Sequence, residues 1–238
     1  MKYVQQNLKR RAGIVGMMCL LAGLLTSCLK NHDSDYVEPP AALISVINAS
    51  PDAQPVNFFL DQNQANTFPI SYGHGLDYIR AFPGKRTASF STSGLSQKLK
   101  SDTISLVDKK FYTIYLTNVV SKPDIVLLAD SIVKPDAGKT SLRLVNVSPD
   151  AGAVDLAIKG GDVIASNTAY KKASLFKQFD GNTYTLEIRK AGTNTVLVTL
   201  TDVKLIGNTI NTVWLQGLSA ATDDKKLSAN VQNNVYYY

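Results

Sequence analysis

The stretch that decides the fold occurs twice: residues 44–57 read ISVINASPDAQPVN, and residues 142–155 read LRLVNVSPDAGAVD. The second copy begins 98 positions after the first, from 44 to 142, and this offset holds to its end. The residues shared by both copies are Asn48, Ser50, Pro51, Asp52, Ala53 and Val56, matched by Asn146, Ser148, Pro149, Asp150, Ala151 and Val154. Self-similarity at a fixed offset indicates a duplicated structural unit, so the sequence predicts two tandem domains of one fold.

Each copy predicts a strand, a corner and a second strand. Apolar residues occupy every second position or more at 43–47 and 142–147, which is typical of a buried or half-buried strand. The proline of Ser-Pro-Asp suits a type I turn, and the flanking serine and aspartate can hydrogen-bond the backbone of the bend. We therefore assign a structural turn role to one set of residues: Asn48, Ser50, Pro51, Asp52, Asn146, Ser148, Pro149 and Asp150. The alternative, that Asp52 and Asp150 are catalytic or calcium-binding carboxylates, is weaker because a calcium loop needs several oxygen ligands.

The rest of the chain repeats the same pattern of short strands. No segment longer than about ten residues has sustained helical periodicity, and turn residues recur at roughly 8–12-residue spacing, which indicates sandwiches or barrels. Residues 113–116 correspond to 212–215, and residues 126–129 to 227–230. The predicted fold class is all-β, with two tandem immunoglobulin-like or prealbumin-like β-sandwich domains. The expected bounds are 43–131 for the first domain, 132–139 for a linker and 140–238 for the second domain.

The N-terminus has the order of a secretory signal. Four basic residues within 1–11 precede an apolar run at 14–25, which is too short for a confident membrane span. The junction Leu-Thr-Ser-Cys at 25–28 resembles a bacterial lipobox, with an ordinary signal peptide and a chance cysteine as the alternative. We expect residues 1–27 to be a cleaved lipoprotein signal peptide, Cys28 to be the lipidation site and residues 28–42 to be a flexible tether.

The lipobox resemblance implies a location. It implies diacylglycerol on the Cys28 sulfur and anchoring by several acyl chains of the palmitate type, which hold a protein on a membrane without a spanning helix. Leu29 follows the cysteine, and the lack of aspartate there implies the outer membrane, facing the periplasm or the cell surface. The other cysteine, Cys19, lies in the cleaved segment, so we expect no disulfide in the mature chain.

The charge balance argues against a nucleic-acid partner. The formal net charge of +6 falls to +2 once the four basic residues of 1–27 are removed. Neither predicted domain concentrates basic residues as a nucleic-acid-binding surface would.

The two repeated motifs resemble the domain of unknown function 4397 family. The pattern that carries the resemblance is (I/L)-x-(V/L)-(I/V)-N-x-S-P-D-A-x-x-V-(N/D), at 44–57 and 142–155. The family is bacterial, secreted or lipid-anchored, and often carries the domain in tandem, which implies the same here. Many members have aspartate after the valine, as Asp155 does, whereas Asn57 departs from this pattern. The family has no established activity, so the resemblance implies fold and location only.

The residues needed for common catalytic chemistry are scarce. The two histidines are His32, in the tether, and His74, in the Gly-flanked loop 71–75. Two separated histidines and no mature thiol do not build a typical zinc site. Only two glutamates exist, Glu38 and Glu187, so paired glutamates for glycoside hydrolysis are not indicated. We therefore predict no enzyme activity, no catalytic residues, no metal and no cofactor.

Aromatic residues around one loop are the remaining signal. Tyr72, His74 and Tyr78 are the candidate ligand-binding residues, although Tyr78 also alternates with polar neighbours as a core residue would. The predicted function is a non-catalytic, lipid-anchored cell-envelope protein acting as a structural or protein-interaction module. The alternative is a glycan-binding accessory lipoprotein that uses loop aromatics. The expected partners are the membrane through Cys28 and either envelope proteins or glycans.

Overall fold

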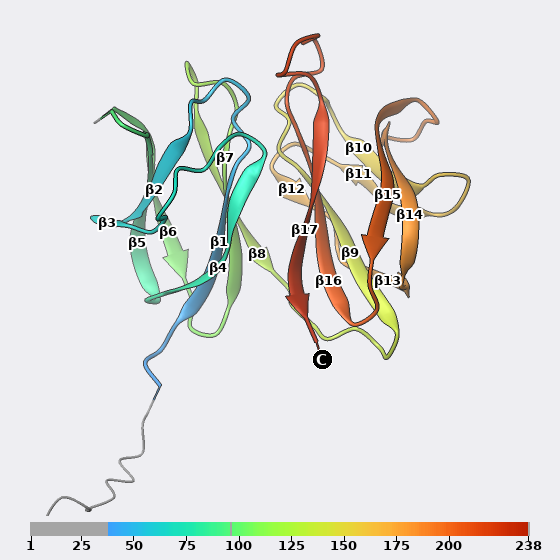
Figure 1. Cartoon of the computed structure of the whole chain (residues 1–238), viewed down its shortest axis with the longest axis horizontal. Coiled ribbons are helices and arrows are strands. Elements are labelled where there is room, and N and C mark those ends of the chain that lie inside the picture. The colour runs from blue at the N-terminus through green and yellow to red at the C-terminus, as the bar shows by residue number, and fades with distance from the viewer. Residues whose placement is uncertain (1–37, 96, 238) are drawn as a thin grey trace, which may run out of the picture. The chain divides into compact units, whose positions relative to one another are not determined.

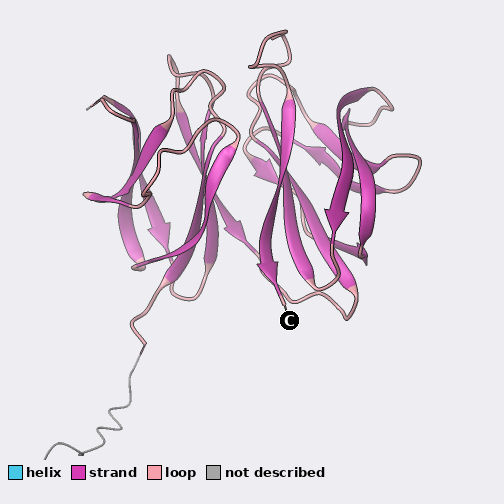
Figure 2. Cartoon of the chain, in the orientation of Figure 1, coloured by secondary structure: helices cyan, strands magenta, loops and turns pink. Residues whose placement is uncertain are grey.

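The fold is all-β, as the sequence predicts. The computed structural model describes residues 38–95 and 97–237, and these contain strands and loops without a helix (Figure 1, Figure 2). Within these residues no helix could therefore cross a membrane. The predicted signal peptide, Cys28 and most of the tether lie outside the described residues.

The strands divide into two sets along the chain. The first set is β1 (Ala42–Asn48), β2 (Val56–Leu60), β3 (Asn63–Gln64), β4 (His74–Ala81), β5 (Gly84–Thr92), β6 (Lys98–Leu106), β7 (Phe111–Thr117) and β8 (Asp124–Asp130). The second set is β9 (Lys139–Asn146), β10 (Val154–Ile158), β11 (Val163–Thr168), β12 (Lys172–Ala173), β13 (Lys177–Asp180), β14 (Asn182–Lys190), β15 (Val196–Leu205), β16 (Thr209–Gln216) and β17 (Ser228–Tyr236). Both sets lie in one compact unit, Pro40–Tyr238.

Each set forms two sheets with the same strand order. The first sandwich pairs the sheet β4-β1-β7-β8 with the sheet β3-β2-β5-β6. The second sandwich pairs the sheet β12-β9-β16-β17 with the sheet β11-β10-β14-β15. β13 also pairs with β9, in the first of these two sheets. β1 runs parallel to β7 and β9 parallel to β16. In the immunoglobulin order the first strand shares a sheet with the second, which β1 and β2 do not do, so the prealbumin-like alternative is the one that applies.

Each sandwich has its own apolar core. Ile44, Phe58, Phe90 and Ile114 are fully buried in the first, where the rings of Phe58 and Phe90 lie 5.0 Å apart. Leu142, Leu156, Leu186, Ile188 and Val213 are fully buried in the second. These residues alternate along their strands with residues of the opposite face, as the pleat of a strand requires.

One predicted correspondence between the two halves is wrong. Leu116 pairs with Ile125, and Leu215 with Ala229, so residue 125 corresponds to 229 and not to 226. The reason is loop length: β7 and β8 are joined by residues 118–123, whereas β16 and β17 are joined by the longer stretch 217–227. Residues 126–129 therefore match 230–233.

Candidate functional site

The two sandwiches contact each other through the faces of β1, β7, β9 and β16 that point away from their own cores. A third cluster of buried residues forms there, which we call the interface cluster: Ile47, Ala49, Tyr115, Val126, Val145, Val147 and Trp214, with Leu128 and Ala173 packed against it. Strands buried on both faces explain why the repeated stretches are apolar at more than every second position.

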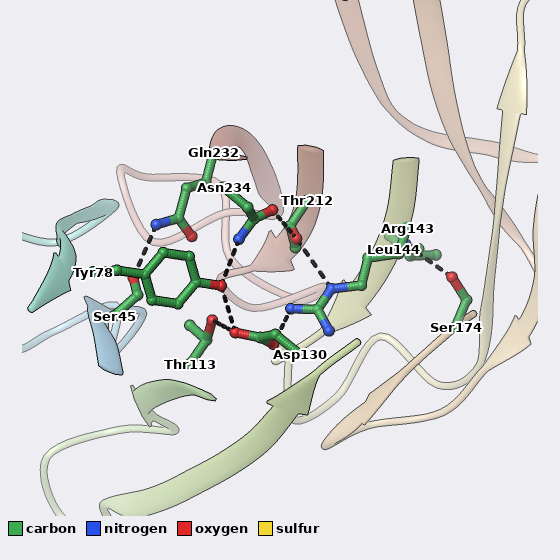
Figure 3. Close-up of polar contacts among 10 residues, drawn as sticks. All are labelled: Ser45, Tyr78, Thr113, Asp130, Arg143, Leu144, Ser174, Thr212, Gln232 and Asn234. Carbon is green, nitrogen blue, oxygen red and sulfur yellow. Dashed lines mark hydrogen bonds and ion pairs between the residues drawn. The ribbon is translucent and has the colours of Figure 1, made fainter. Parts of the chain in front are cut away.

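A buried ion pair links the sandwiches beside this cluster (Figure 3). Arg143 on β9 donates from Nη2 to Oδ1 of Asp130 on β8, and the two side chains are 2% and 0% exposed. Arg143 Nε also donates to Thr212 Oγ1 at 3.0 Å, and its guanidinium lies 4.7 Å from the centre of the Phe176 ring. A buried charge is tolerated only when it is paired and hydrogen-bonded, and Arg143 meets both conditions.

The ion pair belongs to a closed ring of hydrogen bonds. Tyr78 donates its hydroxyl to Asp130 Oδ2 at 2.6 Å and accepts from Asn234 Nδ2 at 3.1 Å. Asn234 Oδ1 accepts from Thr212 Oγ1 at 2.7 Å, which returns the ring to Arg143. We call Tyr78, Asp130, Arg143, Thr212 and Asn234 the interface ring; two members come from the first sandwich and three from the second.

The surroundings hold Tyr78 in its protonated form. Burial raises the pKa of the Tyr78 hydroxyl well above its ordinary value, and the negative charge of Asp130 raises it further. A protonated hydroxyl is the form that can donate to Asp130. The ring is therefore a satisfied structural network, with its charged groups closed off from solvent.

A solvent-accessible groove of about 480 Å³ lies next to the ring, between β4 and β17. Its polar lining comes mainly from His74, Asp77, Asn230, Gln232 and Asn233, and its apolar and aromatic lining includes Ile47, Trp214 and Tyr236. This volume falls within the roughly 300–1,000 Å³ of small-molecule sites. The groove is therefore large enough for a ligand.

The structure places the three predicted ligand residues differently. His74 is exposed and lines the groove, with Nδ1 3.1 Å from the Tyr72 carbonyl oxygen. Tyr78 is a member of the interface ring and does not line the groove. Tyr72 is half-buried, and its hydroxyl has no hydrogen-bond partner among the described residues. Of these three predicted residues, only His74 is therefore available to a ligand in this groove.

The first copy of the repeated motif ties the corner after β1 to two other loops. Asn48 donates from Nδ2 to the Ile70 carbonyl at 3.1 Å and accepts at Oδ1 from the Ser50 amide at 3.2 Å. Ser50 Oγ donates to the Asn118 carbonyl at 2.6 Å, and Asp52 Oδ1 accepts from the Val120 amide at 2.8 Å.

The second copy makes the equivalent bonds. Asn146 Nδ2 donates to the carbonyls of Thr168 and Gly152, and its Oδ1 accepts from the Ser148 amide. Ser148 Oγ donates to the Gly217 carbonyl at 2.7 Å, and Asp150 accepts from the Ser219 amide at 2.8 Å. Asp52 thus holds the loop after β7, and Asp150 holds the loop after β16, the counterpart of β7. The described residues contain no group of three or more His, Cys, Asp or Glu placed to hold a metal ion.

Sequence reasoning missed the interface ring. Arg143 lies within the repeated stretch at 142–155, and Asp130 lies at the end of the first predicted domain. The available signal was the charge itself: an arginine between Leu142 and Leu144, in a run predicted to be buried, needs a partner. The sequence gives no indication of which carboxylate that partner is, because Asp130 is reached through the contact between sandwiches.

Comparison with known proteins gives one family match. Residues 42–157 match the family described as domain of unknown function (DUF4397), a range that includes both copies of the motif. The comparison with curated proteins gives no match.

Two solved structures match this chain with low similarity. One is a family 26 carbohydrate-binding module from Eubacterium rectale Amy13K in complex with maltoheptaose, with 10% identity, a TM-score of 0.27, and 81% of this chain and 97% of that chain covered. The other is a proposed cell adhesion protein from Bacteroides fragilis NCTC 9343, with 8% identity, a TM-score of 0.22, and 84% and 99% covered. Such scores carry no argument about function. The match to the DUF4397 family over residues 42–157 confirms the resemblance seen in the motifs.

Proposed function

We propose that this chain is a non-catalytic, lipid-anchored cell-envelope protein whose two sandwiches bind a partner as one rigid unit. The observation that carries the proposal is the buried Arg143–Asp130 pair, which joins the sandwiches through the interface ring. A charge pair of this kind is costly to separate, because parting the sandwiches leaves each charge without its partner. The protein therefore presents the loops and edges of both sandwiches in a fixed relation, as a structural or protein-interaction module requires.

The second sandwich is proposed to be a second copy of the DUF4397 domain. The repeat offset of 98, the shared strand order and the equivalent motif hydrogen bonds support this assignment.

The distribution of titratable groups supports a non-catalytic role. The most deeply buried pair, Arg143 and Asp130, is engaged within the interface ring. His74 is exposed, and the contact described for its ring is with a backbone carbonyl. In catalytic pairs the histidine base is oriented by a third group, and His74 has no hydrogen bond or ion pair to a carboxylate among the described residues.

The anchor is proposed to be acyl chains on Cys28, and the location the outer membrane. The test is fractionation of cells that produce the full chain or its Cys28→Ser variant. The wild type should stay with membranes after a salt wash and partition into detergent, and the variant should appear in the soluble fraction. A variant that remains with the membranes would contradict the lipid anchor.

The binding role is tested by chemical cross-linking of the tagged full chain in intact cells. We expect a cross-linked product of defined mass with an envelope protein, and its loss in the Cys28→Ser variant. A product that forms equally well from both would show that binding does not depend on membrane placement. A chain that yields only its own mass would contradict a protein partner.

Glycan binding is the second candidate function. The polar groove between β4 and β17 favours it, because several side chains that form hydrogen bonds converge there beside the half-exposed Tyr236.

A further inference from the structure

The interface between the sandwiches has two ends, one between β4 and β17 and the other between β8 and β12. The ends are built from equivalent residues. The repeat offset of 98 matches Gly73 with Lys171 and His74 with Lys172, and the strand register confirms it: His74 pairs with Asn48 and Lys172 with Asn146. The two ends can therefore be compared residue by residue.

The β8–β12 end is filled by side chains. Lys171 Nζ donates to Asp124, and the same nitrogen lies 5.3 Å from the centre of the Tyr170 ring. Val126 and Leu128 on β8 belong to the interface cluster or pack against it. This end is closed by an ion pair over an apolar contact.

The β4–β17 end has polar residues at the same positions. Asn230 corresponds to Val126 and Gln232 to Leu128, by the pairing of β17 with β16 and of β8 with β7. Gly73 replaces Lys171, and both have a positive φ, +77° and +64°. A Cβ on Gly73 would lie 2.9 Å from Gln216 Nε2, so the glycine keeps this end clear. The result is the groove of about 480 Å³.

The groove chemistry selects among ligand classes. Among its described lining residues, Asp77 is the only carboxylate and none is lysine or arginine. A phosphate or carboxylate ligand would lack a cationic partner, and a hard cation would lack the several oxygen ligands it needs. Asn230, Gln232 and His74 offer both donors and acceptors, and Gln232 Oε1 is buried without a partner among the described residues. Tyr236, 52% exposed, adds an aromatic ring.

We propose that this groove binds a neutral saccharide. Hydroxyl groups both donate and accept hydrogen bonds, which matches a lining of amides, one imidazole and one carboxylate. The apolar face of a sugar ring can pack on an aromatic side chain such as Tyr236. The proposal rests on the binding role proposed above and specifies its glycan form, with His74 and Asp77 as the accessible contacts.

The test is a binding assay with the full chain purified in detergent. The probes are neutral oligosaccharides of glucose, mannose, galactose, xylose and N-acetylglucosamine, first on an array and then by titration calorimetry. We expect His74→Ala and Asp77→Ala each to weaken the affinity for a bound sugar about tenfold, the loss expected for one hydrogen bond at a ligand site. Lys172→Ala is the matched control, because Lys172 is the exposed equivalent of His74 at the closed end, and it should bind as the wild type does.

The outcomes separate this proposal from the broader one. If a sugar binds and His74→Ala, Asp77→Ala and Lys172→Ala all keep wild-type affinity, the groove is not the site, although a glycan-binding role stands. If no probe binds, the saccharide proposal is overturned, and the cross-linking experiment decides independently whether the protein has an envelope protein partner. Thermal unfolding of each variant establishes that it is folded, which is expected because His74 and Asp77 are exposed.

Discussion

The closed β8–β12 end and the open β4–β17 end share one backbone arrangement and differ in side chains. In both, the amide after the loop tyrosine bonds to the motif asparagine: Gly73 to the Asn48 carbonyl and Lys171 to the Asn146 carbonyl, each at 2.8 Å. The side chains then decide whether the end is filled or hollow. The side chains at the β8–β12 end thus hold the sandwiches together, whereas those at the β4–β17 end leave a groove that we propose binds a ligand.

The same comparison extends to the interface ring. The repeat places Ser45 in the first sandwich where Arg143 stands in the second, and Tyr78 where Phe176 stands. The negatively charged partner, Asp130, belongs to the first sandwich, and the positively charged partner, Arg143, belongs to the second. Two copies of either sandwich would lack one of these charges at their contact. The ring therefore favours contact between the first and the second sandwich over contact between two copies of the same sandwich. Specifying which surfaces pair is the best-attested role of buried polar groups.

Breaking the ring should give the largest effect. Arg143→Leu leaves the Asp130 carboxylate buried without its cation, so we expect the free energy of unfolding to fall by about 3–5 kcal/mol. Urea denaturation of the full chain measures it. The control is Arg143→Leu combined with Asp130→Asn, which removes the charge but keeps an acceptor for Tyr78, and most of the loss should be recovered. A single variant that loses less than about 1 kcal/mol would contradict a strong pair.

Removing one hydroxyl from the ring should cost less. Tyr78→Phe deletes one of the donors to Asp130, and a hydrogen bond to a charged group contributes about 1.5–3 kcal/mol. Tyr115→Phe is the matched control, because the Tyr115 hydroxyl is also buried but has no partner among the described residues. Its removal should be neutral or stabilising in the same denaturation assay. Equal losses in the two variants would show that the ring bond adds nothing.

The sequence predicted the part of the fold that local patterns encode. The repeated Asn-x-Ser-Pro-Asp motif and the alternating apolar residues indicate paired strands and corners, because turn chemistry and pleat are properties of neighbours in the chain. The sequence could not show that the second face of β1 and β9 meets another sandwich. It also misaligned 126–129, since the different loop lengths before β8 and β17 are visible only in the strand pairing.

The candidate site, like the fold, was only partly predictable from the sequence. His74 is among the predicted residues because it lies with Tyr72 and Tyr78 around one Gly-flanked loop, and it does line the groove. Asn230 and Gln232 were not identified, because amide residues near the end of a chain are ordinary in a sequence. Their significance appears only when they are seen opposite Val126 and Leu128, which are their equivalents at the closed end.

Alkaline pH should weaken the interface through Tyr78 and Tyr115. Burial raises the pKa of Tyr78 and Tyr115 above their ordinary value, so the folded chain keeps protons that the unfolded chain releases near pH 10. The stabilisation is therefore complete below about pH 10 and falls as pH rises, by about 1.4 kcal/mol per pH unit for each tyrosine. Urea denaturation from pH 8 to pH 11 should show this slope, reduced when both residues are changed to Phe. An unchanged slope would assign the effect to other groups.

Converting the open end into the closed one should have a moderate effect. Gly73→Lys places a side chain at φ +77° and against Gln216, and we expect a loss of about 1–2 kcal/mol from the left-handed backbone. Adding Ser228→Asp supplies the equivalent of Asp124 and should restore part of this loss. Denaturation of the single and double variants measures it. If the double variant is no more stable than the single one, Ser228 does not lie where the register places it.

Removing the ion pair at the closed end should give the smallest effect. Lys171 and Asp124 have side chains 42% and 28% exposed, so Asp124→Asn should lower the free energy of unfolding by only about 0.2–1 kcal/mol, and less at high salt. The hydrogen bond from Lys171 to Asp124 raises the pKa of Lys171, although burial lowers it. The stabilisation that comes from this raised pKa is complete below the ordinary lysine value of about 10.4 and is lost as pH rises from there through the raised value, so the wild type and the variant should converge only beyond that rise. Arg143 and Lys171 both pair with an aspartate across the interface, but the two pairs differ in burial. If Asp124→Asn lost as much stability as Arg143→Leu, burial would not be what determines the strength of these pairs.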